Sequence, residues 1–224
     1  MSASVSERHS FGLVVFDFDG TLCDSANVKT EAFYLLYLDD YGPEFAARFR
    51  DYHLDNAGIS RYDKIRHAEA EWLDNQPTDE SVDAIADRYS GIVEEAVVAA
   101  PLFDGVRAFL AQDHPGVRFT LASATPTDEL RRIADRKGIA EFFDAIEGSP
   151  RSKQAILEEY LTDYGMQPGD VVMIGDQPSD LDAARAVGTE ALAVAPPSPW
   201  IAPFPRVDTF AAAADWLTAR FPRT

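Results

Sequence analysis

The stretch LVVFDFDGTLCDS, residues 13–25, decides the fold of this chain. Four apolar residues run directly into two aspartates, Asp17 and Asp19, which are followed by Gly20 and Thr21. An uninterrupted apolar run of this length predicts a strand that is buried on both faces, as in a parallel sheet. Two carboxylates so close together repel each other, and neither is easily buried without a partner. The stretch therefore predicts a buried strand that ends at a positive group or at a site of chemistry.

Three more apolar runs follow the same plan, and each ends in small or acidic residues. They are VRFTLASAT at 117–125, VVMIGD at 171–176 and ALAVAPP at 191–197, with helical patterns between them at 126–139, 152–165 and 179–188. Strands that alternate with helices predict an α/β fold: a mainly parallel, Rossmann-like sheet with helices on both faces. Ligands of such sheets bind at the carboxyl ends of the strands, where Asp17 and Asp19 lie.

The interval 26–99 breaks this alternation. It contains helical patterns at 27–42, 43–53, 60–73 and 81–98, and it contains no convincing strand pattern. This arrangement predicts an all-helical insertion placed directly after the first strand. We therefore expect an α/β core domain from residues 1–25 and 100–224, with a last helix at about 209–219, and an inserted helical domain from residues 26–99.

Composition restricts the possible partners. The chain has 224 residues, with 20 Lys and Arg against 38 Asp and Glu, a formal net charge of −18. So acidic a surface disfavours nucleic acid and anionic membranes as partners, and it is also compatible with a high-salt habitat. No apolar window approaches the roughly 20 residues that span a bilayer, and residues 1–10 lack the pattern of a signal peptide. With a single cysteine, Cys23, these features predict a cytoplasmic protein, but they leave the oligomeric state open.

Asp17 and Asp19 are the first candidates for chemistry. An aspartate can attack phosphorus as a nucleophile, and a second carboxyl can donate a proton to a leaving oxygen and later deprotonate water. Both carboxylates could also bind Mg²⁺, which prefers oxygen ligands. Gly20 permits a tight turn, and the Thr21 hydroxyl could hold a phosphate oxygen. The alternative is an acidic turn or a helix cap with no chemical role.

Ser123 and Lys153 are weaker candidates when each is taken alone. The Ser123 hydroxyl could bind phosphate, or it could belong to a cluster that caps the helix beginning near Thr127. Lys153 lies just inside a helix start, where a cation opposes the helix dipole, so helix propensity does not explain it. A cation at this place would neutralise a nucleophile and a phosphoryl group. Arg151 is the rival for that role, and a solvated lysine is the structural alternative.

Two more aspartates follow the run VVMIG. Asp176 extends the strand and is the better placed metal ligand, whereas Asp180 could bind metal through water or steady Lys153. A structural alternative exists here as well, because Ser179 and Asp182 resemble a capping box. The four histidines show no metal-ligand spacing, so ordinary surface or core roles are expected for them.

The motif DFDGTL at 17–22, Ser123, Lys153 and GDQPSD at 175–180, in that order, resemble the haloacid dehalogenase-like (HAD) hydrolase superfamily. The resemblance covers nearly the whole chain. One departure is mild: Ala124 and Thr125 follow Ser123 where an Asn or a Gly is common in the family.

The resemblance implies a role for each core group. The first aspartate of the motif would form an aspartyl-phosphate and the second would act as acid and then as base, while a serine and a lysine hold the phosphoryl group. Late aspartates would complete a Mg²⁺ site. By position these groups are the catalytic residues Asp17, Asp19 and Lys153, the substrate-binding residues Thr21 and Ser123, and the metal ligands Asp17, Asp19, Asp176 and Asp180.

The inserted helices look like the small α-helical cap of phosphoglycolate phosphatase-like and β-phosphoglucomutase-like members. Three of the seven basic residues of this insertion fall within GISRYDKIRH at 58–67. The Gly-x-Ser-Arg piece looks like the substrate-specificity loop of such caps. We therefore expect Arg61, with Lys64 as second choice, to contact an anionic or hydroxylated distal part of the substrate. The alternative is an exposed amphipathic helix with pairs such as Asp63 with Arg66.

A Mg²⁺-dependent phosphatase acting on a small phosphorylated metabolite is the function that the resemblance favours. A phosphosugar mutase would share every core group. Lys29 lies where mutase-type caps can place a functional basic residue, although an exposed helical lysine is the expectation there.

Dehalogenation is disfavoured, because dehalogenases of the family lack an aspartate at the position of Asp19. A non-catalytic binding protein is the alternative from another class, and it would tolerate the loss of core groups, none of which is missing.

Overall fold

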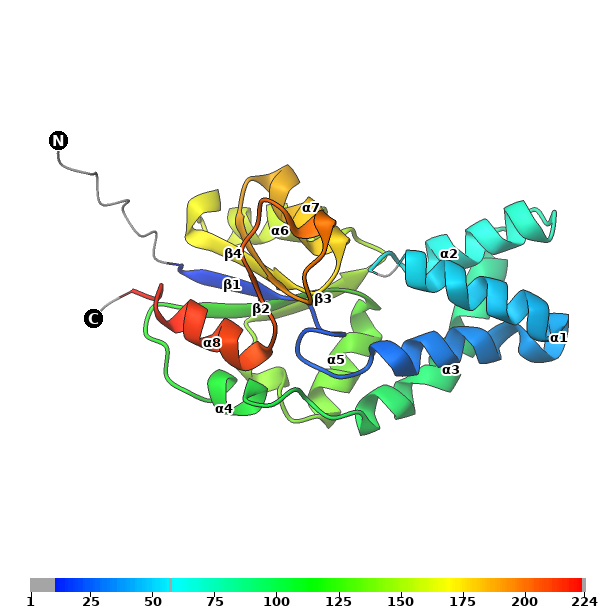
Figure 1. Ribbon diagram of the computed structural model, residues 1–224, viewed down its shortest axis with the longest axis horizontal. Coiled ribbons are helices and arrows are strands. Elements are labelled where there is room, and N and C mark those ends of the chain that lie inside the picture. The colour runs from blue at the N-terminus through cyan, green and yellow to red at the C-terminus, as the bar shows by residue number, and fades with distance from the viewer. Residues whose placement is uncertain (1–10, 57, 223–224) are drawn as a thin grey trace.

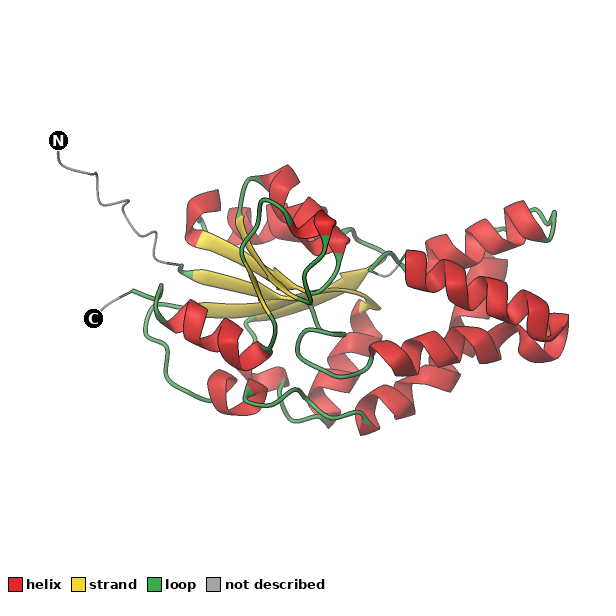
Figure 2. Ribbon diagram, in the orientation of Figure 1, coloured by secondary structure: helices red, strands yellow, loops and turns green. Residues whose placement is uncertain are grey.

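The computed structural model describes residues 11–56 and 58–222, so the prediction about a signal peptide, which concerns residues 1–10, lies outside the described residues. Its centre is a six-stranded sheet in the order β3-β2-β1-β4-β5-β6, in which every pair of neighbours is parallel. The strands are β1 (Leu13–Phe16), β2 (Arg118–Pro126), β3 (Ala145–Ser149), β4 (Val171–Gly175), β5 (Glu190–Val194) and β6 (Arg206–Val207). Figure 2 shows this sheet between two layers of helices, which confirms the predicted α/β fold.

Strand β1 lies in the middle of the sheet, between β2 and β4. Val14 and Phe16 belong to the hydrophobic cluster on one face, whereas Leu13 and Val15 belong to the cluster on the other face. All four side chains are completely buried. The strand is apolar at every position because both of its faces are covered.

Helices cover both faces of the sheet (Figure 1). On one face lie α6 (Lys153–Asp163) and α7 (Pro178–Val187). On the other lie α4 (Val106–Leu110), α5 (Thr127–Arg136) and α8 (Phe210–Thr218), and α8 confirms the helix predicted near the end of the chain. The connections contain the short helices η2 (Ala140–Phe142), η3 (Pro168–Asp170) and η4 (Pro199–Ile201).

The chain between β1 and α4 forms a helical unit beyond one end of the sheet (Figure 1). It consists of α1 (Ala26–Asp55), α2 (Arg61–His67), η1 (Ala68–Trp72) and α3 (Asp79–Ala99), with no strand among its described residues. Helix α1 breaks at Gly42, where φ is 79° and Pro43 follows, so the two helical patterns expected there meet at a kink. We propose residues 26–99 as a cap and residues 1–25 and 100–224 as a core.

Two strands were missed from the sequence. Strand β3 includes Glu147 and Gly148 among its five residues, and β6 has only two residues, so neither shows the apolar run that marks the other four strands. Both lie at the edges of the sheet, where side chains need not be as closely packed or as apolar as in the central strands. None of the described helices combines the length and the apolar character needed to cross a membrane.

Candidate active site

The chain turns sharply where β1 ends. Asp17 follows the strand directly, and its backbone N–H donates to the Ile174 carbonyl of β4 at 2.8 Å. Gly20 adopts a φ of +79°, and a Cβ atom there would lie only 2.3 Å from Asp176 Oδ2. Glycine is required at this position both for the backbone conformation and for the space. The turn therefore brings the first loop against the carboxylate that follows β4.

Three carboxylates and one lysine meet at the carboxyl ends of β1 and β4. Asp17, Asp176 and Asp180 each offer an oxygen, and these oxygens all lie within 4.8 Å of one another. Lys153 Nζ lies 2.9 Å from Asp17 Oδ2 and 2.5 Å from Asp180 Oδ1. Lys153 is the first residue of α6, and the start of this helix delivers its ammonium to the acidic cluster. We call Asp17, Asp176 and Asp180 the acidic cluster below.

Arg151, the rival of Lys153, points elsewhere. Its guanidinium pairs with Glu147 at 3.0 Å and also with Glu159, and its side chain is 35% exposed. The Lys153 side chain is 6% exposed and contacts Asp17. The structure therefore brings Lys153, and not Arg151, to the proposed nucleophile.

The acidic cluster carries more negative charge than Lys153 balances. Burial raises the pKa of Asp17, and the neighbouring Asp180 and Asp176 raise it further, whereas Lys153 lowers it. Burial and Asp180 also raise the pKa of Asp176 to about 6. A divalent cation with oxygen ligands would relieve this repulsion. The donor set fits Mg²⁺, the ion expected from the sequence.

Asp180 has a second, structural role at the start of α7. Its Oδ2 accepts from the Gln177 backbone N–H at 3.0 Å, so Gln177 and Asp180 form the capping box. The predicted capping box of Ser179 and Asp182 is therefore wrong, because the helix begins two residues earlier than that box requires, at Pro178 with Gln177 as its N-cap. Asp180 is completely buried. One of its oxygens accepts from the Gln177 backbone N–H at the start of α7, and the other accepts from the Lys153 ammonium.

Asp19 lies apart from the acidic cluster. Its carboxylate accepts from Lys29 Nζ at 2.5 Å, from Ser25 Oγ at 2.6 Å and from Thr125 Oγ1 at 3.0 Å. Burial works to raise the pKa of Asp19, but the ion pair with Lys29 and these hydrogen bonds hold it below its usual value. A metal-binding role for the Asp19 side chain stays a prediction, because in this structure its carboxylate accepts hydrogen bonds from Lys29, Ser25 and Thr125.

The expectation of an exposed lysine at position 29 is wrong. The Lys29 side chain is only 13% exposed, and its ammonium also donates to Thr125 Oγ1 at 2.6 Å. The Lys29 backbone N–H donates to the Ser25 carbonyl at 3.1 Å, which places Lys29 one turn into α1. Its position one helical turn after the motif is the signal that could have identified it.

Ser123 and Thr21, the two hydroxyls expected to bind phosphate, have different surroundings. Ser123 lines a cavity beside Asp17, and its Oγ accepts from the Thr125 backbone N–H at 3.2 Å. Thr21 Oγ1 instead donates to Asp176 Oδ1 at 3.0 Å. Ser123 is therefore placed to meet a ligand, while Thr21 orients a carboxylate of the acidic cluster.

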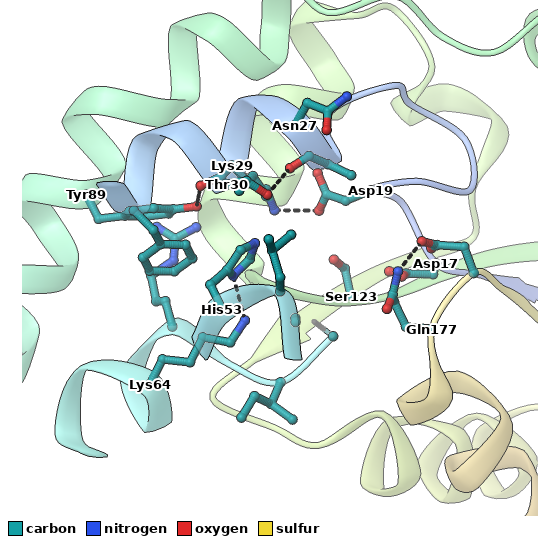
Figure 3. Close-up of a pocket in the computed structure, with 18 residues that line it drawn as sticks. Asp17, Asp19, Asn27, Lys29, Thr30, His53, Lys64, Tyr89, Ser123 and Gln177 are labelled. Atoms are coloured by element: carbon teal, nitrogen blue, oxygen red, sulfur yellow. Dashed lines mark hydrogen bonds and ion pairs between the residues drawn. The ribbon is translucent and has the colours of Figure 1, made fainter. Parts of the chain in front are cut away.

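That cavity, of about 250 Å³, lies between the core and the cap (Figure 3). The cap supplies residues from α1, from the loop before α2, from α2 and from α3. The core supplies Asp17, Asp19, Ser123, Ala124, Asp176 and Gln177. A cavity of this size suits a small ligand, because pockets for drug-sized molecules begin at about 300 Å³.

Gly58, in the loop before α2, approaches the core closely. Its φ is +86°, and a Cβ atom there would lie 2.3 Å from Ser179 Oγ and 3.1 Å from Gln177 Cβ. Glycine allows this close approach, and the element approached is the beginning of α7. The loop thus forms part of the cavity wall next to the beginning of α7.

Arg61 joins the cap to the core. Its two terminal nitrogens lie 2.7 Å from the two carboxylate oxygens of Glu129 on α5, and Ser90 Oγ of α3 hydrogen-bonds to both side chains. The Arg61 and Glu129 side chains are 4% and 3% exposed. The guanidinium also lies 4.5 Å over the Tyr89 ring. Arg61 lines the cavity as expected, but its charge is balanced by Glu129, a partner that sequence reasoning missed.

Lys64 also lines the cavity, and it has no acidic partner among the described residues. It is 2% exposed, and its Nζ lies 2.9 Å from His53 Nδ1. Burial, together with Lys29 and Arg61, lowers the pKa of Lys64 to about 7. Burial and Lys64 lower the pKa of His53 to about 3.

The exposed amphipathic helix considered as an alternative is therefore wrong for Arg61 and Lys64, which are both buried. It holds for Arg66, which is exposed, although the carboxylate that it pairs with is Asp79, at 2.8 Å, and not Asp63.

A model of the haloacid dehalogenase-like hydrolase family matches residues 11–188. The chain belongs to this family. The matched range includes every core group described above, from Asp17 to Asp180, and the resemblance seen in the sequence is confirmed.

The proteins of known name that this chain resembles include two kinds of enzyme. Phosphoglycolate phosphatase of Synechococcus elongatus is 28% identical over 184 residues, which cover 81% of this chain and 82% of that protein. Tyrosine-protein kinase PtkA of Mycobacterium tuberculosis is 30% identical over 200 residues, which cover 81% of this chain but only 61% of that protein.

Solved structures share the fold over almost the full length. A β-phosphoglucomutase from Clostridium difficile has a TM-score of 0.74 at 16% identity, over 94% of this chain and 96% of that chain. At this identity the likeness shows the fold alone.

Proposed function

We propose that this HAD-like hydrolase is a Mg²⁺-dependent phosphatase that hydrolyses a small phosphorylated metabolite through an aspartyl-phosphate on Asp17. The observation that carries the proposal is the contact of Lys153 with Asp17 and Asp180 at a cavity lined by Ser123. A nucleophile, a cation for the phosphoryl group and a hydroxyl donor are thereby gathered at one place. The phosphoglycolate phosphatases among the relatives support this class of reaction.

The reaction proceeds in two displacements. In the first, an Asp17 carboxylate oxygen forms a bond to phosphorus, the bond from phosphorus to the ester oxygen breaks, and Asp19 in its protonated form donates a proton to the departing alcohol. Because Lys29 holds the pKa of Asp19 low, only the protonated fraction of Asp19 is competent for this step. In the second, Asp19 takes a proton from water, the water oxygen bonds to phosphorus, and the bond to Asp17 breaks, which releases inorganic phosphate. Lys153 and Ser123 hold the phosphoryl oxygens in both steps.

Mg²⁺ would be held by Asp17, Asp176 and Asp180, with Thr21 orienting Asp176 through its hydroxyl. When bound, it would neutralise the charge of the phosphoryl group and of the acidic cluster. Asp19 enters this proposal as the acid and base, because its carboxylate is held by Lys29, Ser25 and Thr125 outside the cluster.

The cavity between the cap and the core supports a small substrate. Twelve cap residues contribute to its wall, so a ligand whose phosphate reaches Asp17 is covered by the cap. The kinase name of one relative introduces phosphoryl transfer to a protein as another possible class. A cavity of about 250 Å³ favours a metabolite over a protein side chain that remains attached to a folded partner.

The test is release of inorganic phosphate from a panel of phosphorylated metabolites and from p-nitrophenyl phosphate, with Mg²⁺ and with EDTA. We expect Mg²⁺-dependent release by the wild type and none by Asp17→Asn, together with an acid-stable phosphoenzyme or a pre-steady-state burst that Asp17→Asn lacks. Isomerised sugar phosphate without net release would indicate a mutase. No turnover of any compound would favour a binding protein and would overturn the proposal.

A further inference from the structure

Three basic side chains of the cap line the cavity, and two of them are paired with carboxylates. Lys29 is paired with Asp19, and Arg61 is paired with Glu129. Lys64 forms no ion pair with any described residue, although it is 2% exposed. Burial lowers the pKa of Lys64 to about 7, so near neutral pH its side chain is charged only in part, and an anion beside it would stabilise the ammonium form. The surroundings of Lys64 therefore suit an anionic ligand, because no described residue supplies a counter-ion to it.

His53 holds Lys64 without neutralising it. The His53 ring is itself buried, and its pKa is lowered to about 3, so at neutral pH the ring is uncharged and Nδ1 accepts one hydrogen bond from the ammonium. The Phe33 ring lies 5.4 Å from Lys64 Nζ and adds a cation–π contact. An ammonium has three N–H groups, and His53 uses one of them. Positive charge and donor capacity thus remain for a ligand in the cavity.

The count of charges limits what this ligand can be. The pairs Lys29–Asp19 and Arg61–Glu129 are each neutral, so the cap side of the cavity carries at most one excess positive charge, that of protonated Lys64. A carboxylate brings one negative charge, whereas a second phosphoryl group brings about −1.5 to −2 at pH 7. One ammonium balances the carboxylate and leaves the second phosphate undercompensated in a buried place.

We propose that the substrate is a small phosphate monoester that also carries one carboxylate, and that Lys64 binds this carboxylate. The inference rests on the proposed phosphatase function and extends it to a substrate class. The two ends of the cavity match the two ends of such a molecule. Figure 3 shows Asp17 and Gln177 on one side, Lys64 and His53 on the other, and Ser123 between them. Lys64 is a substrate-binding residue, and His53 is a positioning residue that fixes its ammonium.

Matched substrates test the proposal. 3-Phosphoglycerate and glycerol 3-phosphate share a three-carbon skeleton and differ in a carboxylate against a neutral hydroxymethyl group. 2-Phosphoglycolate and 2-hydroxyethyl phosphate form the same pair with two carbons. The readout is the ratio of kcat/KM for the acid to kcat/KM for its neutral partner, measured for the wild type, for Lys64→Met and for Arg66→Met. Arg66 is the control because it is a basic residue of the same helix that is exposed and paired with Asp79.

We expect the wild type to prefer at least one acid over its neutral partner by about 10- to 100-fold, the range of a charge-assisted hydrogen bond. Lys64→Met should reduce this ratio toward 1, and Arg66→Met should keep it. A wild-type ratio near 1, or an equal loss on both members of a pair in Lys64→Met, would overturn the assignment. So would faster turnover of glycerol 1,3-bisphosphate than of both acids.

A binding measurement separates failure of this inference from failure of the proposed function. Asp17→Asn and the double variant Asp17→Asn/Lys64→Met are titrated calorimetrically with 3-phosphoglycerate and with glycerol 3-phosphate. Preferential binding of the acid that disappears with Lys64 supports the carboxylate site even if no phosphate is released by the wild type. Phosphate release without any preference for the acid supports the phosphatase and rejects the carboxylate site.

Discussion

Lys29 of the cap and Asp19 of the core form an ion pair in which Nζ lies 2.5 Å from Oδ2. Thr125, also from the core, hydrogen-bonds to both partners, at 2.6 Å from Lys29 and 3.0 Å from Asp19. The group assigned to proton transfer is therefore fixed from both sides of the cavity. Departure of the cap would remove a partner from Asp19, so the position of the cap and the readiness of the acid–base group are linked.

Replacing Asp19 by Asn should lower kcat by about 10²- to 10⁴-fold on alkyl phosphates, because their alcohols leave poorly without a proton. The loss should be much smaller for the first step with p-nitrophenyl phosphate, whose leaving group needs no proton. Burst and steady-state rates on the two substrates measure this difference. Equal losses in the burst rate on both would argue against Asp19 as the acid.

Replacing Lys29 by Met should lower kcat by about 10-fold or more, because Asp19 loses the partner that orients it. Lys29→Arg should retain part of the activity. In the Asp19→Asn variant, replacing Lys29 by Met should lower kcat little further, because the carboxylate that Lys29 orients is already absent. If the losses of kcat were additive in this double-mutant cycle, Lys29 would not act through Asp19.

Mg²⁺ should stabilise the folded protein through the acidic cluster. At a concentration about 100 times Kd, binding to the native state contributes about 2.7 kcal/mol, which corresponds to a rise in Tm of about 5–10 °C for a chain of this size. Thermal unfolding with Mg²⁺ and with EDTA measures the rise. Asp176→Asn should abolish most of it, and a full rise in that variant would place the ion elsewhere.

The Arg61–Glu129 pair should behave as a buried ion pair. Removing one partner leaves the other charge buried, so Arg61→Met and Glu129→Gln should each lower the free energy of unfolding, by about 3–5 kcal/mol for a fully buried pair. The double variant Arg61→Met/Glu129→Met should recover part of the loss. Urea unfolding curves test this, and a double variant that is as unstable as the sum of the single ones would exclude direct coupling.

Lys64 should make stability depend on pH in a defined direction. Its pKa in the folded state is lowered to about 7, from 10.5, by burial with Lys29 and Arg61 nearby, while His53 is neutral and Asp63 acts weakly in the opposite direction. Between these two values the unfolded chain binds the extra proton, so the contribution of Lys64 makes stability rise with pH. Lys64→Met should therefore raise Tm most below pH 7, and the gain should shrink toward pH 10. A gain that is independent of pH would contradict the charged state assigned to Lys64.

His53 should act only through Lys64. His53→Leu removes the acceptor at Nδ1, so KM for carboxylated substrates should rise while kcat changes less. In a Lys64→Met background the same change should no longer affect the preference for the acid. Measurement of KM and kcat in the four proteins of this cycle distinguishes positioning from general packing, which would persist without Lys64.

Much of the core was predictable because its signals are local. The run Leu13–Phe16 predicts a strand buried on both faces, and a parallel sheet then brings Asp17 and Asp176 to one edge. The helix start at Lys153 could be read from the residues around it, as could the turn at Gly20. The sequence thus predicted that Asp17, Asp176, Asp180 and Lys153 meet. It did not predict that Asp19 lies apart from them or that Thr21 bonds to Asp176.

The partners of the basic cap residues were not predictable, because they depend on how the cap sits on the core. Glu129 is 68 residues from Arg61 along the chain, and Thr125 is 96 residues from Lys29. No pattern within α2 indicates that Arg61 is balanced while Lys64 is not. That difference is set by tertiary packing. It is the reason why our proposal prefers Lys64 as the substrate ligand, whereas the sequence suggested Arg61 first.

The Arg61–Glu129 and Lys29–Asp19 contacts also bear on the making of chimaeras. If the helical insert were replaced by one from another protein, Glu129 would remain buried without the ion pair to Arg61. Asp19 would lose its ion pair with Lys29 and keep only its hydrogen bonds within the core. A functional hybrid would have to carry basic residues at the places of Arg61 and Lys29, or receive a compensating change at position 129. The two segments of this enzyme therefore have to be exchanged together with their matching charges.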